Sequence, residues 1–146
     1  MKKIVISLIT LFAIIMIVIL MYISQNNREV AKVKEYNQFY ENYMNKEIFG
    51  VDVTTIINKA TNENEKNNVQ KDDNGFFIEN DTNSIKIELK LLGKDEVQTY
   101  QMETLQKVGL EGFIKNFNLT NFKCSNIEYH EKTNFVKKII FEQIEE

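Results

Sequence analysis

Two single residues are the sequence's main candidates for chemistry, because Cys124 is the only cysteine and His130 the only histidine. A lone cysteine excludes both an intramolecular disulfide and a thiolate metal cluster. Glu128 and His130 are two residues apart, so on a strand their side chains share a face, as a metal site or an acid–base pair requires. His130 falls in a predicted turn, however, where we expect an exposed ring. Cys124 reads as a buried, small apolar side chain, with a reactive thiol or an intermolecular disulfide as the alternatives.

The acidic stretch Asp72-Asp73-Asn74-Gly75 resembles part of a calcium-binding loop. An EF-hand loop needs oxygen ligands at alternate positions, an invariant glycine at its sixth position and a bidentate Glu at its last. With Gly75 as that glycine, the first ligand is Gln70 and the last is Asp81, so the register fails. Asn74-Gly75 before a predicted strand is better explained as a turn. We therefore expect no bound metal and no cofactor.

Catalysis generally needs several polar groups that converge in a pocket. This chain offers one His, one Cys and one Arg, and it has no Gly-rich phosphate loop. We therefore expect no catalytic residues and no enzymatic activity, with a membrane-anchored enzyme that uses His130 or Cys124 as the alternative.

The apolar segment Ile4–Ile23 dominates the rest of the sequence. It has 20 residues without a charge, a Pro or a Gly, which as a helix spans about 30 Å, the thickness of the hydrocarbon core of a bilayer. The segment predicts a transmembrane helix over residues 4–23, with membrane lipid as its partner.

The charges that flank this segment predict its orientation. Lys2 and Lys3 precede it directly, and basic residues favour the cytoplasmic side. We expect residues 1–3 in the cytoplasm and the C-terminal part outside the cell membrane. The segment is longer than the apolar core of a cleaved leader, which favours a single-pass signal anchor.

The amino-acid composition indicates the kind of host genome and argues against one class of partner. The chain has 17 Lys against a single Arg and no Pro or Trp, a bias that indicates an AT-rich genome, such as that of a low-GC Gram-positive bacterium. Without Lys2 and Lys3, 16 basic and 21 acidic residues remain, a net charge of −5. An acidic domain is a poor nucleic-acid binder, so we expect no nucleic-acid partner. The length beyond the membrane suffices for one domain.

A helical stripe follows the apolar segment and predicts an amphipathic stalk helix over residues 24–47, continuous with the membrane helix. Its apolar and aromatic members recur at spacings of three and four around Asn37. They are Val30, Val33, Tyr36, Tyr40, Tyr43 and Met44. Such a stripe is either the seam that packs against the chain's own domain or a surface that binds a partner.

Residues 48–146 read as a small extracytoplasmic α+β domain. Gly50 is a candidate C-terminal cap of the stalk, and Asp52 can cap a second helix. A solvated loop precedes a turn-rich region with strands of period two, which favours a three-stranded antiparallel meander. The predicted helices are Val53–Asn62 and Glu103–Asn116, of which the second is weakened by Gly109 and Gly112. The predicted loop is Thr61–Gly75, and the strands of the meander are Phe76–Glu79, Ser84–Leu91 and Val97–Met102. A terminal hairpin of Phe122–Tyr129 and Phe135–Ile144 completes the domain.

The predicted order is thus α-α-β-β-β-α-β-β with an antiparallel sheet. A short basic start, an apolar helix that continues into an amphipathic one and a small α+β head resemble the plan of type IV pilins and pseudopilins. The sequence departs from that family, because Lys3 runs directly into Ile4 without a leader glycine and no acidic residue lies within Ile4–Ile23.

The sequence also resembles small single-pass membrane proteins of low-GC Gram-positive bacteria, a resemblance that implies no activity. The segments that carry it are Tyr36–Tyr40, Gly50–Val53 with Ile57–Ala60, and Phe122–Cys124 with Ile127–His130. Together these features predict a non-enzymatic interaction or structural module of the cell envelope, which binds an envelope protein or assembles with itself. A pilin-like assembly subunit is the alternative.

Overall fold

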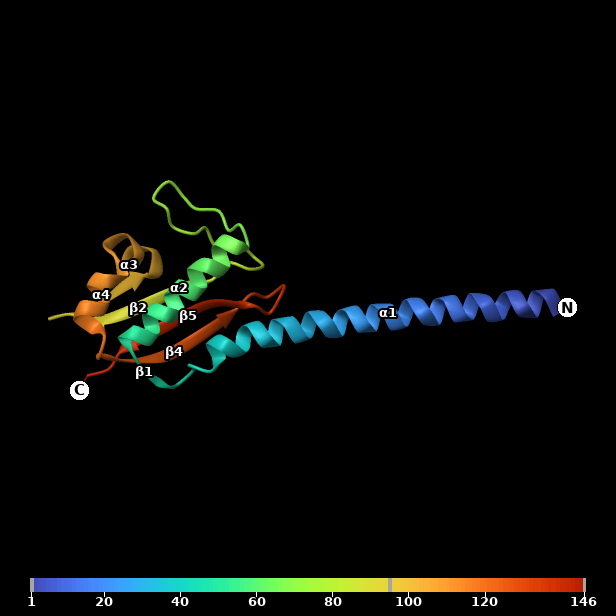
Figure 1. The fold of residues 1–146 in the computed structure, drawn as a ribbon, viewed down its shortest axis with the longest axis horizontal. Coiled ribbons are helices and arrows are strands. Elements are labelled where there is room, and N and C mark those ends of the chain that lie inside the picture. Colours follow the sequence, from blue (N-terminus) through green and yellow to red (C-terminus); the bar gives the residue numbers. More distant parts are fainter. Residues whose placement is uncertain (1, 95, 146) are drawn as a thin grey trace. The chain divides into compact units, whose positions relative to one another are not determined.

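The computed structural model describes residues 2–94 and 96–145, and its chain has the α+β architecture that the sequence predicted (Figure 1). It divides into two compact units, one up to Glu35 and one from Tyr36 onward. The elements in order are α1 (Lys2–Glu41), β1 (Glu47–Phe49), α2 (Gly50–Lys66), β2 (Lys86–Leu92), β3 (Val97–Gln101), α3 (Met102–Val108), α4 (Leu110–Phe117), β4 (Asn121–Tyr129) and β5 (Val136–Gln143).

The first unit consists of α1 up to Glu35, and this helix is long and apolar enough to cross a membrane. None of its most apolar window is buried within the structure. The hydroxyl of Thr10 donates to the carbonyl oxygens of Ile6 and Ser7, at 3.1 and 2.9 Å. A polar side chain in the apolar stretch is therefore satisfied by the helix itself, as a nonpolar environment requires.

The second unit is built on a five-stranded sheet in the order β1-β4-β5-β2-β3. Neighbouring strands are antiparallel except β2 and β5, which are parallel, with Ile87 beside Ile139. The sheet is therefore mixed, where the sequence had predicted an antiparallel one. The difference arises because the chain crosses over through α3 and α4 after β3 and returns as the β4–β5 hairpin. The hairpin then places β5 beside β2.

The prediction of a strand over Phe76–Glu79 is wrong. Phe77 forms only an isolated bridge with Lys71, because β5 and β3 occupy both sides of β2. Phe77 is instead buried in the core, and its N–H donates to the carboxylate of Glu103 at 3.3 Å. The three-stranded meander is thus reduced to the β2–β3 hairpin.

The stalk helix ends earlier than predicted, at Glu41 rather than residue 47. Asn45 adopts a left-handed backbone with φ 58°, which Asn tolerates better than most residues. Its N–H donates to the carbonyl oxygen of Cys124 at 3.0 Å. This turn leads into β1, a short strand that the sequence analysis missed.

Gly50 begins α2 and does not cap the stalk helix, in contrast to the prediction. Its backbone lies so close to Phe117 that a Cβ at position 50 would come within 2.0 Å of the Phe117 carbonyl oxygen. Asp52 lies in the first turn of α2, where its carboxylate accepts from the Phe49 N–H at 3.3 Å. The helix extends to Lys66, so the predicted loop begins later than Thr61.

Gly109 divides the predicted helix Glu103–Asn116 into α3 and α4. Its φ of 93° is a conformation that residues with a Cβ rarely adopt. The break thus falls at one of the two glycines that had been expected to weaken the helix, while Gly112 lies within α4. The terminal hairpin is confirmed, with Cys124 paired to Phe141.

The core lies on one face of the sheet, beneath α2, α3 and α4 (Figure 1). Ile87 and Leu89 of β2 and Phe141 of β5 are essentially inaccessible, and each contributes roughly 1.5–3 kcal/mol by burial. Tyr40, from the last turn of α1, is also fully buried in this cluster. The end of α1 is therefore part of the core of the second unit.

We expect Gly50→Ala to lower the free energy of unfolding by more than ~2 kcal/mol, because the new methyl group overlaps the Phe117 backbone. Gly112→Ala is the matched control, since a Cβ there meets no atom within 4 Å and Ala stabilises a helix by ~0.5–1 kcal/mol relative to Gly. Denaturant unfolding of the full chain in detergent micelles, followed by circular dichroism, measures both. Equal effects of the two substitutions would contradict the close approach.

Candidate functional site

The face of the sheet opposite the core carries side chains in a regular charged array. In β2, Lys86, Glu88 and Lys90 alternate with buried residues and are half-buried themselves. The register brings Lys90 beside Glu142 of β5, and Lys86 beside Lys138. No helix of the described ranges 2–94 and 96–145 covers these residues (Figure 1). We call this surface of β2 and β5 the open face.

Ion pairs across the strands neutralise most of the open face. Lys138 contacts Glu88 at 2.9 Å and Lys90 contacts Glu142 at 2.7 Å. The Lys138–Glu88 pair runs diagonally from β5 to β2, which offsets the repulsion between the adjacent lysines at 86 and 138. The open face therefore has strong local charges of both signs and little net charge.

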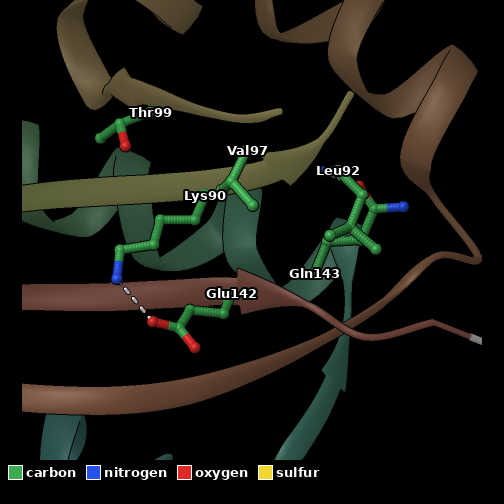
Figure 2. Close-up of a pocket in the computed structure, with 6 residues that line it drawn as sticks. All are labelled: Lys90, Leu92, Val97, Thr99, Glu142 and Gln143. Atoms are coloured by element: carbon green, nitrogen blue, oxygen red, sulfur yellow. Dashed lines mark hydrogen bonds and ion pairs between the residues drawn. The ribbon is translucent and has the colours of Figure 1, made fainter. Parts of the chain in front are cut away.

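A hollow of about 460 Å³ lies at one end of the open face (Figure 2). Its lining combines the Lys90–Glu142 pair with the apolar side chains of Leu92 and Val97. Both apolar side chains are partly exposed, at 38% and 55%. Gln143 closes the end of the hollow, where its side-chain oxygen accepts from the Leu92 N–H at 3.1 Å. The hollow can hold a side chain of mixed polarity, and Thr99 also lines it.

The predicted stripe takes up two kinds of environment. Within the second unit, Tyr40 is buried and Tyr36, Tyr43 and Met44 are partly buried against the core. Burial raises the pKa of Tyr36 to about 12 and also raises that of Tyr40, so both hydroxyls stay protonated. Within the first unit, Val30 is 59% exposed and Val33 is half-buried. The structure thus places the aromatic members of the stripe against the chain's own domain.

Asn37, in the middle of the stripe, binds backbone groups on both sides of Phe135. Its side-chain nitrogen donates to the Asn134 carbonyl oxygen at 2.7 Å, and its oxygen accepts from the Val136 N–H at 3.0 Å. Asn64 of α2 bonds both backbone groups of Ile85 itself: it donates to the carbonyl oxygen and accepts from the N–H, each at 2.8 Å. A buried asparagine therefore pairs with backbone groups at the start of each of the two parallel strands.

The prediction of an exposed His130 was wrong, because the ring is only 2% exposed. Its Nε2 lies 2.7 Å from the Ser84 carbonyl oxygen, to which it donates, since a carbonyl can only accept. The β4–β5 connection packs against the loop before β2, where Thr133 also donates to the Thr82 carbonyl at 2.6 Å. No hydrogen bond joins His130 to Glu128 among the described residues, so the acid–base pair is not formed.

A second hollow, of about 510 Å³, lies beside His130 and is lined mainly by charged groups. Its lysines already have partners, since Lys132 pairs with Asp81 and Lys137 with Glu79. The hydrogen bond from Lys137 lowers the pKa of the Glu79 carboxyl below its ordinary value. These ion pairs join the loop before β2 to the β4–β5 connection and to β5.

Cys124 is fully buried in the core, as expected. Burial raises the pKa of its thiol to about 11, and the nucleophilic form of cysteine is the thiolate. At neutral pH the side chain therefore remains a protonated, inaccessible thiol.

The acidic stretch around Asp72 forms a turn. One carboxylate oxygen of Asp72 accepts from the N–H groups of Asn74 and Phe76, at 2.9 and 2.8 Å, and Gly75 has φ 76°. Over residues 2–94 and 96–145, no three His, Cys, Asp or Glu side chains are grouped as a metal site requires.

Comparisons of the chain with models of protein families, with curated proteins and with solved structures found no match.

We expect Lys90→Met to raise the pKa of Glu142, because the hydrogen bond from Lys90 lowers it from its ordinary value of 4.5. A lowered pKa in the folded state stabilises the fold at neutral pH, and this contribution is lost as the pH falls through the lowered pKa. Since both side chains are more than a third exposed, the loss of stability should stay below ~1 kcal/mol.

A carboxyl NMR titration of the folded chain in micelles measures this pKa. Lys86→Met is the control, because Lys86 pairs with Glu79 and not with Glu142. A Glu142 pKa that is the same with and without Lys90 would contradict the pairing.

Proposed function

We propose that the protein is a single-pass membrane protein that displays a small, non-enzymatic interaction domain on the outer side of the cell membrane. The observation that carries the proposal is the exposure of the apolar part of α1. Its large apolar side chains between Ile4 and Ile23 are each at least 42% exposed. Such a surface is far larger than a soluble monomer normally presents to water, and a bilayer of about 30 Å matches its length.

The proposed orientation rests on the charges before the helix. Lys2 and Lys3 stand next to the apolar segment, on the side that the positive-inside rule assigns to the cytoplasm. The C-terminal domain then faces the cell envelope.

The proposed role in interaction rests on what the open face combines. It has ordered charges of both signs from β2 and β5, together with the hollow beside Leu92 and Val97. Protein interfaces commonly use such a mixture, in which charged groups select the partner and a few apolar side chains supply binding energy. The proposed partner is an envelope protein with a complementary charge pattern.

The environments of Cys124 and His130 favour this role over an enzymatic one. The thiol is buried and protonated, and the imidazole is held by the Ser84 carbonyl. Among residues 2–94 and 96–145, the hydrogen bonds of these two side chains lead to backbone carbonyls and not to a second catalytic group, the usual means of activating a nucleophile or a general base.

Replacing both Ile14 and Ile15 by Lys should release the protein from the membrane, because each Lys near the helix centre costs roughly 2.5–3.5 kcal/mol of insertion free energy. The double Leu variant at the same positions should stay inserted. Fractionation with an alkaline carbonate wash separates the two outcomes, and a wild-type chain found in the soluble fraction would overturn the anchoring.

Orientation is tested on the same cells. Protease added to intact protoplasts should digest a C-terminal tag, and protection of the tag would place the domain in the cytoplasm.

The choice between interaction and catalysis can be tested by complementation of a deletion strain. Lys90→Glu with Lys138→Glu should abolish function, because both ion pairs of the open face become pairs of like negative charges. Lys66→Glu with Lys115→Glu changes the net charge equally on exposed helix positions and should be silent.

Cys124→Ala and His130→Gln should both complement, since Gln keeps an N–H donor for the Ser84 carbonyl. Loss of function in either folded variant, with the open-face variant active, would favour catalysis instead.

A further inference from the structure

The two edges of the sheet differ in length and in charge. β1 forms one edge with three residues and begins with Glu47. β3 forms the other edge with five residues, Val97–Gln101, of which none is charged and none is Pro. Natural proteins usually protect edge strands with charge, Pro, a bulge or short length. β1 has two of these protections, whereas β3 has none of them.

The register of the β2–β3 hairpin identifies the backbone groups that β3 leaves free. The Gly93 N–H donates to the Glu96 carbonyl at 3.0 Å, so these two residues form a hydrogen-bonded pair. In an antiparallel ladder such pairs alternate with non-bonded ones, which directs the backbone groups of Gln98 and Tyr100 toward β2. The backbone N–H and C=O of Val97 and Thr99 and the N–H of Gln101 therefore point away from the sheet. The C=O of Gln101, the N-cap of α3, accepts the first bond of that helix.

These outward groups have no partner in the described ranges 2–94 and 96–145, where no hydrogen bond from outside the sheet reaches them. Four of the five residues of β3 are exposed, and Tyr100 is half-buried. The edge is thus an uncharged row of unpaired backbone groups, the arrangement to which another strand can be added.

We propose that β3 of a second copy of this chain pairs antiparallel with β3, about a two-fold axis at Thr99. Thr99 then faces Thr99 of the other copy, and Val97 faces Gln101. This pairing forms roughly four backbone hydrogen bonds, two between the Thr99 residues and one from each Gln101 N–H to the Val97 carbonyl of the other copy. The interface is isologous, so both copies contribute the same residues.

The second copy is favoured as the occupant because the edge is complementary to itself in charge. No charged side chain opposes another anywhere along the paired strands. A Thr–Thr pair at the centre is one of the favourable cross-strand combinations. Gln98 lies beside Tyr100 of the other copy, and within one copy these two side chains already share a hydrogen bond of 2.5 Å. The paired sheets would continue as one ten-stranded sheet.

Cross-linking of the full chain in detergent micelles tests the proposed register. In a Cys124→Ala background, Thr99→Cys should give a covalent dimer with a short bis-maleimide reagent, because the two positions face each other. Thr55→Cys is the control, an exposed threonine on α2, and it should remain monomeric. Equal dimer yields from the two positions, or no dimer from position 99, would overturn the proposal.

Light scattering on chains without the cross-linker tests how much the β3 edge contributes to dimer formation. Thr99→Lys places two like charges at the centre of the interface and should lower the dimer fraction at least tenfold, whereas Thr99→Val should keep it. The side chain at position 99 is exposed and its N–H points outward, so the circular dichroism spectrum of the folded chain should be unchanged. A dimer that survives Thr99→Lys forms elsewhere, through α1 for example, and overturns the inference.

A wild-type chain that is monomeric yet resists carbonate extraction would also overturn the inference, while leaving the proposed membrane anchoring intact.

Discussion

The parallel pairing of β2 with β5 is the constraint on which the rest of the domain depends. The parallel strands β2 and β5 start at the same end of the sheet, where side chains from other elements bond the buried backbone groups at their starts. Asn64 of α2 binds both backbone groups of Ile85, and Asn37 of α1 binds the groups that flank the start of β5. His130 adds the bond to Ser84. Losing one of these partners would leave buried polar groups unpaired, at a cost of about 1–3 kcal/mol each.

This constraint also explains why the domain has its helices where it does. The ends of α1 and α2 come together because each supplies an asparagine to the same end of the sheet. Aromatic rings fill the space between them, with Tyr36 edge-on to Phe135 at 5.0 Å and the Lys59 ammonium 4.7 Å from the centre of the Phe39 ring. The opposite face needs no helix, because ion pairs such as Lys138–Glu88 satisfy its polar side chains.

Local signals in the sequence predicted much of this fold. The alternation in β2, the terminal hairpin and the interruption at Gly109 all depend on neighbouring residues, and the structure contains them. The position of β5 beside β2 depends on residues far apart in the chain, and no period or turn signal encodes it. The burial of His130 follows from that same long-range arrangement, since Ser84 lies before β2. The charges of the open face could be assigned to one side of β2 from the alternation, but their partners on β5 could not.

The bonds of Asn37 also bear on how the chain is made. Asn37 binds groups 97 and 99 residues further along the chain, so the domain cannot close until nearly all of it has been synthesised. At 5–20 residues per second, the start of the domain waits roughly 5 to 20 s for its last strand. Under the proposed topology, α1 can insert into the membrane during that interval while the remainder is still unfolded, and a translocation channel accepts an unfolded chain. Formation of β5 would then complete the domain, and the folded domain could not pass back through the channel.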